Sequence, residues 1–280
     1  MALSEATELY LSELAVTGRS PGTVDLQTYL LRKLATAVGK GHPVTAVNHD
    51  CISIYLANFL KAGRKQSYVA LNAKVIRRFL GWAAETGIIK ENPLRGMRVA
   101  AGTWRPVPPF THDECRRLIV AAKNPMQTAL VYLLLDTGLR ATELTSLCVA
   151  DVDLIKGEIR VTAGKGGKVR VVALNPIPRK AILAYLSERV TSNGLLWPEG
   201  YDRKKLGGML LTLGHRAGVE HCHPHRFRHT FASYFLKASG GDALALKALL
   251  GHSSLTMVTR YVGVLEGERA VEVHRAHSLV

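Results

Sequence analysis

Six side chains between positions 140 and 261 of this 280-residue sequence are of types that could together cleave a phosphodiester. They are Arg140, Lys165, His225, Arg228, His252 and Tyr261. In a site without a metal ion, guanidinium forks and imidazolium donors must offset the charge that develops on the phosphoryl oxygens. A tyrosine that attacks phosphorus keeps the energy of the backbone bond in a covalent phosphoester, so the strand can be resealed without ATP. The set therefore indicates chemistry on DNA strands.

The spacing of these residues favours a common site. His225 and Arg228 are three positions apart in a helical stretch, so their side chains share one face and can converge on one phosphate. Gly138 is expected to end the preceding helix in a left-handed turn, which lets Arg140 leave a helix terminus and point into a cleft. Lys165 is expected at the basic tip of a two-stranded hairpin.

Several of these residues also have a purely structural interpretation. Arg140 could be a surface arginine at a helix end, and Lys165 could be an ordinary hairpin-tip lysine, since Lys168 lies close by. Tyr261 could be a packed aromatic residue, with Tyr234 as the true hydroxyl. Tyr234 follows the second arginine on a continuous helix, however, and is expected to face elsewhere.

A group of histidine and cysteine residues raises the alternative of a metal site. Its members are His221, Cys222, His223, His225 and His229. Pro224 interrupts the group, and the 4 cysteines of the chain are scattered without a CxxC pair of zinc-ligand spacing. We therefore expect no metal, no cofactor and no disulfide framework.

The composition favours a polyanionic partner. The chain carries 37 Lys and Arg against 22 Asp and Glu, a net charge of +15, and the excess is present in residues 1–100 as well as in the remainder. Such a distribution suits a clamp on DNA, with a solvated basic surface as the alternative. The N-terminus lacks a signal-peptide pattern, and the longest apolar run is far below the roughly 20 residues that span a bilayer. A cytoplasmic protein with no membrane partner is expected.

The first domain is expected to be a bundle of four helices. Apolar repeats predict helices over residues 5–16, 23–38, 48–61 and 66–86. Six basic residues surround the last of them: Arg64, Lys65, Lys74, Arg77, Arg78 and Lys90. Their exposed side chains either lie along DNA phosphates or form a solvated helix face, and the sequence supports both interpretations about equally.

Proline and glycine residues between the two parts predict a linker over residues 96–110. A capping box at Thr111 and Glu114 opens the second domain, residues 111–280, which is expected to be mainly helical with one small antiparallel sheet. Helices are predicted over residues 111–122, 125–138, 178–190, 202–217, 225–237 and 242–250, with a further helix from 253 that carries Tyr261. Apolar alternation at 159, 161 and 163, and again at 169, 171 and 173, predicts the hairpin.

These motifs resemble the signature of the tyrosine recombinase (phage integrase) family. The matching segments are Thr137-Gly-Leu-Arg140 with Glu143 and Leu144, Gly164-Lys165-Gly166 with Lys168, His225-x-x-Arg228-His229-Thr230, Leu250-Gly251-His252 and Tyr261. Their order and all their intervals match. The N-terminal helices, residues 1–95, also resemble the family's SAM-like core-binding domain, and residues 111–280 resemble its catalytic domain.

The resemblance implies that four of these side chains act directly on the scissile phosphate. Arg140, Arg228 and His252 would hold the scissile phosphate, and Tyr261 would attack it to form a covalent 3′-phosphotyrosine. A free phenol with a pKa near 10 is a poor nucleophile at neutral pH unless a neighbouring base or cations favour loss of its proton.

The resemblance also implies the proton transfers. Lys165 would protonate the leaving 5′-hydroxyl, and His225 would be the acid–base partner of the tyrosine. Glu143 is expected to orient Arg140 rather than to act on the DNA.

The implied partners follow from the same family. They are a double-stranded DNA core site, a homotetramer on two duplexes and accessory DNA-bending proteins, in a simple two-domain protein without an arm-site-binding module. Two alternatives remain: a non-cutting architectural protein of the same fold, and a type IB topoisomerase or telomere resolvase.

Overall fold

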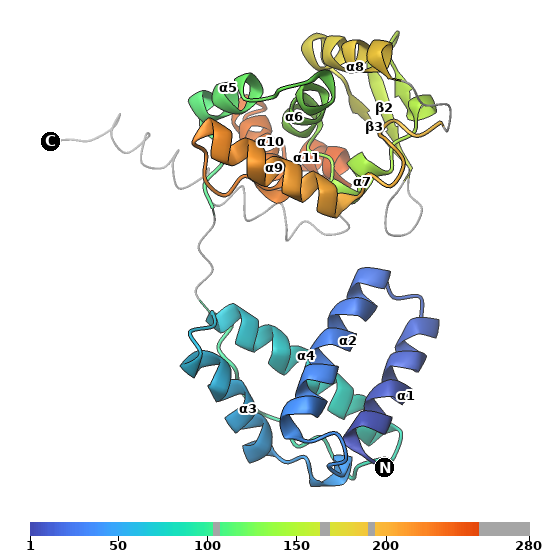
Figure 1. The fold of residues 1–280 in the computed structure, drawn as a ribbon, viewed down its shortest axis with the longest axis vertical. Helices are drawn as coiled ribbons and strands as arrows, with labels where there is room; N and C mark the ends of the chain where they lie inside the picture. The colour runs from blue at the N-terminus through green and yellow to red at the C-terminus, as the bar shows by residue number, and fades with distance from the viewer. Residues whose placement is uncertain (103–106, 163–168, 190–193, 252–280) are drawn as a thin grey trace, which may run out of the picture. The chain divides into compact units, whose positions relative to one another are not determined.

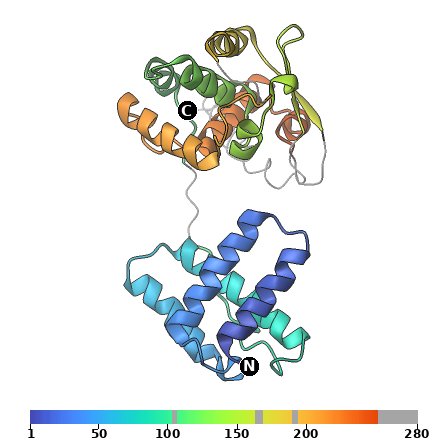
Figure 2. The same cartoon turned by 45° about the vertical axis from the view of Figure 1, so that its right-hand side comes forward.

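The chain forms two compact units, Met1–Pro106 and Val107–Val280 (Figures 1 and 2). The structure is a computed structural model, and it describes residues 1–102, 107–162, 169–189 and 194–251. No helix in these ranges is both long and apolar enough to cross a membrane.

The first unit contains the four predicted helices and one short 3-10 turn. They are α1 (Leu3–Val16), α2 (Pro21–Val38), η1 (Val44–Ala46), α3 (His49–Lys61) and α4 (Gln66–Glu85). Helix α2 begins two residues before the predicted start, because Pro21 suits the first helical position. The carbonyl of the Asn48 side chain accepts a hydrogen bond from the amide of Cys51 and so caps α3.

The core of the first unit is built around α4. Ile76, Phe79 and Leu80 of this helix are fully buried. The hydroxyl of Tyr10 in α1 donates to the side-chain carbonyl of Gln27 in α2 at 2.8 Å, which satisfies the buried polar groups of both. This packing directs the opposite, basic side of α4 to solvent.

The second unit is mainly helical with one small sheet, as the sequence predicts. Its elements are α5 (His112–Val120), α6 (Pro125–Thr137), α7 (Ala141–Thr145), η2 (Val149–Asp151), β1 (Val152–Asp153), β2 (Glu158–Val161), β3 (Arg170–Ala173), α8 (Pro176–Glu188), α9 (Arg203–Ala217), α10 (Pro224–Ala238) and α11 (Ala243–Leu250). The strands pair antiparallel in the order β1-β2-β3. The apolar helix α6 packs against both α8 and α10. Helix α8 begins at Pro176, two residues earlier than predicted, again with proline in the first turn.

The sheet corrects the predicted alternation of the second hairpin strand. Ile159 lies opposite Val172 and Val161 lies opposite Arg170 in the ladder, and directly opposed residues project to the same face. Val172 is therefore buried, whereas Val171, which the sequence pattern placed on the inner face, is 50% exposed. The side chain of Arg170 turns inward with Val172.

The predicted linker, residues 96–110, ends inside the second unit. Phe110 is fully buried, and its ring lies edge-on against an aromatic ring of α10. Its amide donates to Oγ1 of Thr230 at 2.8 Å, and Nε of Arg226 donates to the carbonyl of Pro108 at 3.0 Å. The last residues of the segment are thus fastened to helix α10, and the connecting part is shorter than the sequence suggests.

Candidate active site

The turn between α6 and α7 places Arg140 at the start of a short helix. Gly138 ends α6 with a φ of 59°, in the left-handed region that favours glycine. A Cβ at this position would also lie 2.4 Å from Cδ1 of Phe231 in α10. Two independent constraints therefore require glycine here, and the predicted exit of Arg140 from a helix terminus is observed.

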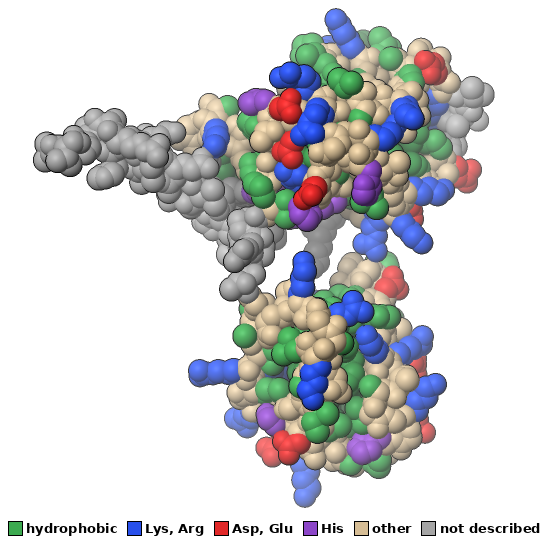
Figure 3. All heavy atoms as spheres, turned by 60° about the vertical axis from the view of Figure 1, so that its left-hand side comes forward, with side chains coloured by type: hydrophobic (Ala, Val, Ile, Leu, Met, Phe, Trp, Pro, Cys, Tyr) green, Lys and Arg blue, Asp and Glu red, His purple; other side chains and the backbone are tan. Residues whose placement is uncertain are grey.

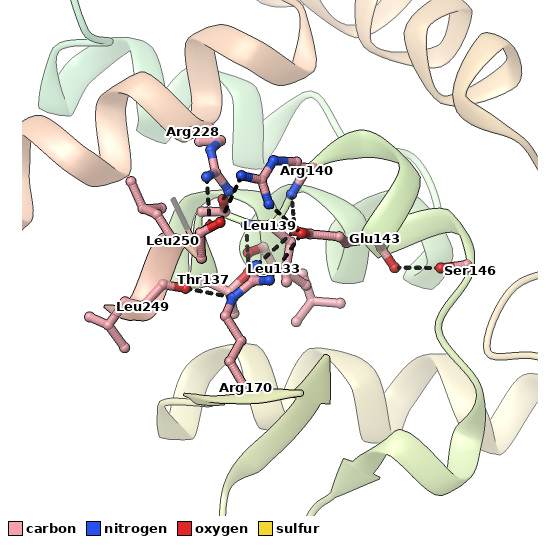
Figure 4. Close-up of polar contacts among 12 residues, drawn as sticks. Leu133, Thr137, Leu139, Arg140, Glu143, Ser146, Arg170, Arg228, Leu249 and Leu250 are labelled. Atoms are coloured by element: carbon pink, nitrogen blue, oxygen red, sulfur yellow. Dashed lines mark hydrogen bonds and ion pairs between the residues drawn. The ribbon is translucent and has the colours of Figure 1, made fainter. Parts of the chain in front are cut away.

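Glu143 of α7 is the centre of a buried charge cluster (Figure 4). Its side chain is 1% exposed, and its Oε1 accepts from Nη1 of Arg140 at 2.6 Å and from Nη1 of Arg170 at 2.9 Å. Its Oε2 accepts from the backbone amide of Arg140 at 2.8 Å and from Nη2 of Arg170 at 2.7 Å. Burial alone would raise the pKa of this carboxyl, but hydrogen bonds from both arginines and the charge of Arg170 hold it at about 2.

Both proposed phosphate-binding arginines contact the C-terminal end of α11. Arg228 is 4% exposed; its Nη1 donates to the carbonyl of Gly138 at 2.7 Å and its Nη2 to that of Leu250 at 2.8 Å. Arg140 is more accessible, with 38% of its side chain exposed, and its Nη2 donates to the carbonyl of Gly251 at 3.1 Å. Segments from three distant parts of the sequence therefore meet directly before His252.

A third arginine completes this arrangement. Nε of Arg170 donates to the carbonyl of Leu249 at 2.7 Å, so three successive carbonyls at the end of α11 each accept from a different guanidinium. Unpaired carbonyls and the helix dipole make such an end partly negative, which favours cations there. Gly251 has a φ of 61°, and a Cβ on it would lie 2.9 Å from Nη1 of Arg170.

His225 lies in the first turn of α10, three residues before Arg228, and its side chain is exposed. Partial desolvation and the charge of Arg228 both lower its pKa. The neutral imidazole is thus favoured at pH 7 and can accept a proton. Lys165, His252 and Tyr261 lie outside the described residues.

The residues considered as an alternative nucleophile or as metal ligands make structural contacts instead. Tyr234 packs edge-on against His112 of α5, with ring centroids 4.8 Å apart, and desolvation raises its pKa. Cys222 is buried with its pKa raised to about 12, and His223 caps the N-terminus of α10. Within the described ranges, no group of three or more His, Cys, Asp or Glu side chains is placed to hold a metal ion.

The basic residues expected on DNA are mostly exposed on the first unit. Arg77 is half-buried, and its Nη2 donates to the carbonyl of Met97 at 2.5 Å. The exposed members are Arg64, Lys65, Lys74, Arg78 and Lys90. Figure 3 shows Lys and Arg side chains over the visible faces of both units.

Arg170 is a site residue that sequence reasoning missed. Apolar alternation placed the neighbouring valines on the inner face and left the arginine outside. The signal appears only once the strand register is known: an arginine directly opposite the buried Val161 needs a buried anionic partner, since an unpaired charge is costly to bury.

A family model described as the phage integrase family matches residues 109–268. The chain belongs to the phage integrase family. The tyrosine recombinase XerC of Proteus mirabilis is 30% identical to this recombinase over 280 aligned residues, which cover 92% of the chain and 89% of XerC. The tyrosine recombinase XerA of Thermococcus kodakarensis is 31% identical, over 93% of the chain and 91% of XerA.

Solved structures have the same fold as this recombinase. The Tn1549 transposon integrase in complex with a circular intermediate DNA matches with a TM-score of 0.78 at 20% identity, over 93% of this chain and 95% of that one. A lambda integrase dimer bound to a COC′ core site matches with a TM-score of 0.76 at 18% identity, with the same coverage. The family cleaves and rejoins DNA, so this chain is a site-specific recombinase, and the non-cutting alternative is not favoured.

Proposed function

We propose that Arg140 and Arg228 cradle the scissile phosphate of a DNA core site and that Tyr261 attacks it. The convergence of both guanidiniums on the end of α11 carries this proposal. Their hydrogen bonds to the carbonyls of Leu250 and Gly251 hold two cationic forks against the two residues that immediately precede His252 in the sequence. Guanidinium forks suit the charge that grows on phosphoryl oxygens.

Tyr261, His225 and Lys165 together account for the bonds and protons of the cleavage step. The phenol oxygen of Tyr261 forms a bond to phosphorus as the bond to the 5′-oxygen breaks. The phenol proton passes to neutral His225, and Lys165 donates a proton to the leaving 5′-oxygen. A 3′-phosphotyrosine and a free 5′-hydroxyl result, and attack by a 5′-hydroxyl reverses the step.

The assembly is proposed from the family. Residues 1–95 act as the core-binding domain, and two duplexes are recombined within a homotetramer, with accessory DNA-bending proteins as further partners. The net charge of +15 and the five exposed basic residues in and around α4 support DNA binding. The lambda integrase core-site complex gives a structural precedent in a protein of the same fold.

A covalent-trapping experiment tests this function. A core site is first selected from a random duplex pool by binding to the protein, and nicked duplexes of that site are then incubated with it. Loss of the short 5′-hydroxyl fragment traps any protein–DNA adduct, which is detected in denaturing gels.

The adduct is expected in excess EDTA and in Tyr234→Phe, and it is expected to be lost in Tyr261→Phe. An adduct that persists in Tyr261→Phe contradicts the nucleophile assignment. Cleavage that stops in EDTA and returns with a divalent ion contradicts the arginine-based mechanism.

A further inference from the structure

We propose that Arg170 is a positioning residue for DNA cleavage, which keeps Arg140 in place and keeps its positive charge available to the phosphate. The inference rests on the proposed role of Arg140 as a phosphate-binding residue. Arg170 itself is 12% exposed on its side chain and is held inside the unit, so it acts through its neighbours.

The first argument is the shared carboxylate. Both oxygens of Glu143 accept one hydrogen bond from Arg140 and one from Arg170. The two contacts of Arg170 form a fork, with N–O distances of 2.9 and 2.7 Å, and this fork fixes the plane of the carboxylate. The carboxylate plane in turn sets the direction in which the guanidinium of Arg140 lies.

The second argument is charge. A buried carboxylate paired with Arg140 alone would cancel most of the positive charge that a phosphate needs. Arg170 compensates Glu143, so three guanidiniums and one carboxylate leave two positive charges in excess among the described residues of the cluster. A phosphodiester brings one negative charge, and its transition state places more on the oxygens, so this excess favours the transition state.

The third argument is the link to α11. Nε of Arg170 donates to the carbonyl of Leu249, and its Nη1 lies where a side chain on Gly251 would have to be. Arg170 thereby connects β3 both to α7 and to the C-terminal end of α11. Figure 4 shows Arg170 reaching from the strand to Glu143 beside Arg140.

Three variants and one control separate a positioning role from a general loss of stability. Arg170→Gln removes the charge, and Arg170→Lys keeps the charge but loses the fork. Arg140→Ala removes the residue through which Arg170 is proposed to act. Arg179→Gln is the matched control, because Arg179 is also half-buried in the second unit but donates to the carbonyls of Leu154 and Ile155, away from the cluster.

Each protein is assayed in single-turnover cleavage of the selected core site with two versions of the scissile linkage. One is the natural phosphate, and the other is a methylphosphonate, in which a methyl group replaces one charged oxygen. The rate on the natural phosphate divided by the rate on the methylphosphonate reports how strongly catalysis depends on that charge. Both rates come from one preparation, so the ratio is insensitive to the fraction of folded protein.

Arg170→Gln is expected to cleave the phosphate about 10–100-fold more slowly than the wild type, with its Kd for the site changed less than roughly threefold. Its rate ratio is expected to fall by about tenfold or more, toward that of Arg140→Ala, because the neutral linkage has less need of the charge. Arg170→Lys should lie between Arg170→Gln and the wild type, and Arg179→Gln should keep the wild-type ratio.

Wild-type cleavage by Arg170→Gln, or an equal deficit on both linkages, would overturn the positioning role. Wild-type cleavage by Arg140→Ala would instead contradict the proposed function itself. A defect in Arg140→Ala together with an unchanged ratio in Arg170→Gln would contradict the inference alone.

Discussion

The guanidinium of Arg228 and the carbonyl of Leu250 are joined by a hydrogen bond of 2.8 Å inside the protein. The other terminal nitrogen of Arg228 donates to the carbonyl of Gly138, so the fork is oriented before any DNA arrives. Preorganised donors of this kind spend little free energy on reorientation in the transition state. Arg228 should therefore act on the rate of cleavage more than on affinity.

Arg228→Ala should slow single-turnover cleavage by about 10²–10³-fold while its affinity for the core site stays nearly normal. Arg228→Lys should restore little, since an ammonium cannot make the two-pronged contact. The rate is measured at saturating protein, with affinity measured in parallel and the folded fraction checked by thermal unfolding. Wild-type cleavage with lost affinity would show that Arg228 is an ordinary phosphate anchor.

Lys165 is predicted to be the acid that protonates the leaving oxygen. A substrate with sulfur in place of the 5′-bridging oxygen needs no such acid, because a thiol has a pKa of about 8.5 and leaves as the thiolate. Lys165→Ala should lose about 10²–10⁴-fold in rate on the oxygen substrate and little on the sulfur substrate. Lys168→Ala is the matched control, and the reverse pattern would make Lys168 the acid.

His225 should give cleavage a characteristic pH dependence. Its folded-state pKa is lowered below the ordinary value of 6.5, so the imidazole is neutral at pH 7 and becomes protonated only in more acidic solution. A protonated imidazole cannot accept the proton of the phenol, and the rate should therefore fall as the pH drops below 6.5. The profile of His225→Gln should lack this step, while His221→Gln should keep it; a step with its midpoint above 6.5 would contradict the assignment.

Glu143 should contribute to stability in a defined pH window. Its pKa is 4.5 when unfolded and about 2 when folded, so its stabilisation is complete above pH 4.5 and is lost as the pH falls toward 2. The difference in free energy of unfolding between the wild type and Glu143→Gln should shrink by about 2 kcal/mol between pH 7 and pH 3. Urea unfolding measures it, and Glu8→Gln, which removes an exposed partner of Arg32, should show little such change.

The basic side of α4 should be visible in the salt dependence of binding. Lys74 and Arg78 are exposed and four residues apart, on one side of the helix. Replacing both with Gln should make the plot of log K against log salt shallower by about 2, since each phosphate contact contributes roughly 0.9. Arg32→Gln is the control, because Arg32 of α2 is paired with Glu8 of α1. An unchanged slope in the double variant would place α4 away from the phosphates.

Local sequence signals predicted most of the elements that carry the site. The capping box at Thr111 and Glu114 is present, with the Glu114 amide donating to Oγ1 of Thr111 at 3.1 Å. The exit of Arg140 from a glycine-terminated helix is also present, because Gly138 alone determines that turn. Such features depend on contacts within a few residues, which a sequence shows directly.

The position of Arg170 could not be predicted in the same way. Apolar alternation has no preference for either face of this strand, because Val169 and Val171 lie on one side of it and Val172 and Leu174 on the other. The register is therefore decided by the partner of the charged residue. That partner, Glu143, is 27 positions away in the chain and on another element. Pairing over that distance is set by tertiary packing and not by local propensity.

The fastening of Pro108 and Phe110 to α10 determines where the chain between the units can vary in length during evolution. Arg226 and Thr230 hold these residues on either side of Arg228 along the helix. An inserted residue between 108 and 110 would pull Phe110 from its buried place and strain the helix that carries the arginine. Among relatives of this recombinase, insertions and deletions are therefore expected ahead of Val107, and the span from Pro108 to Phe110 is expected to keep a constant length.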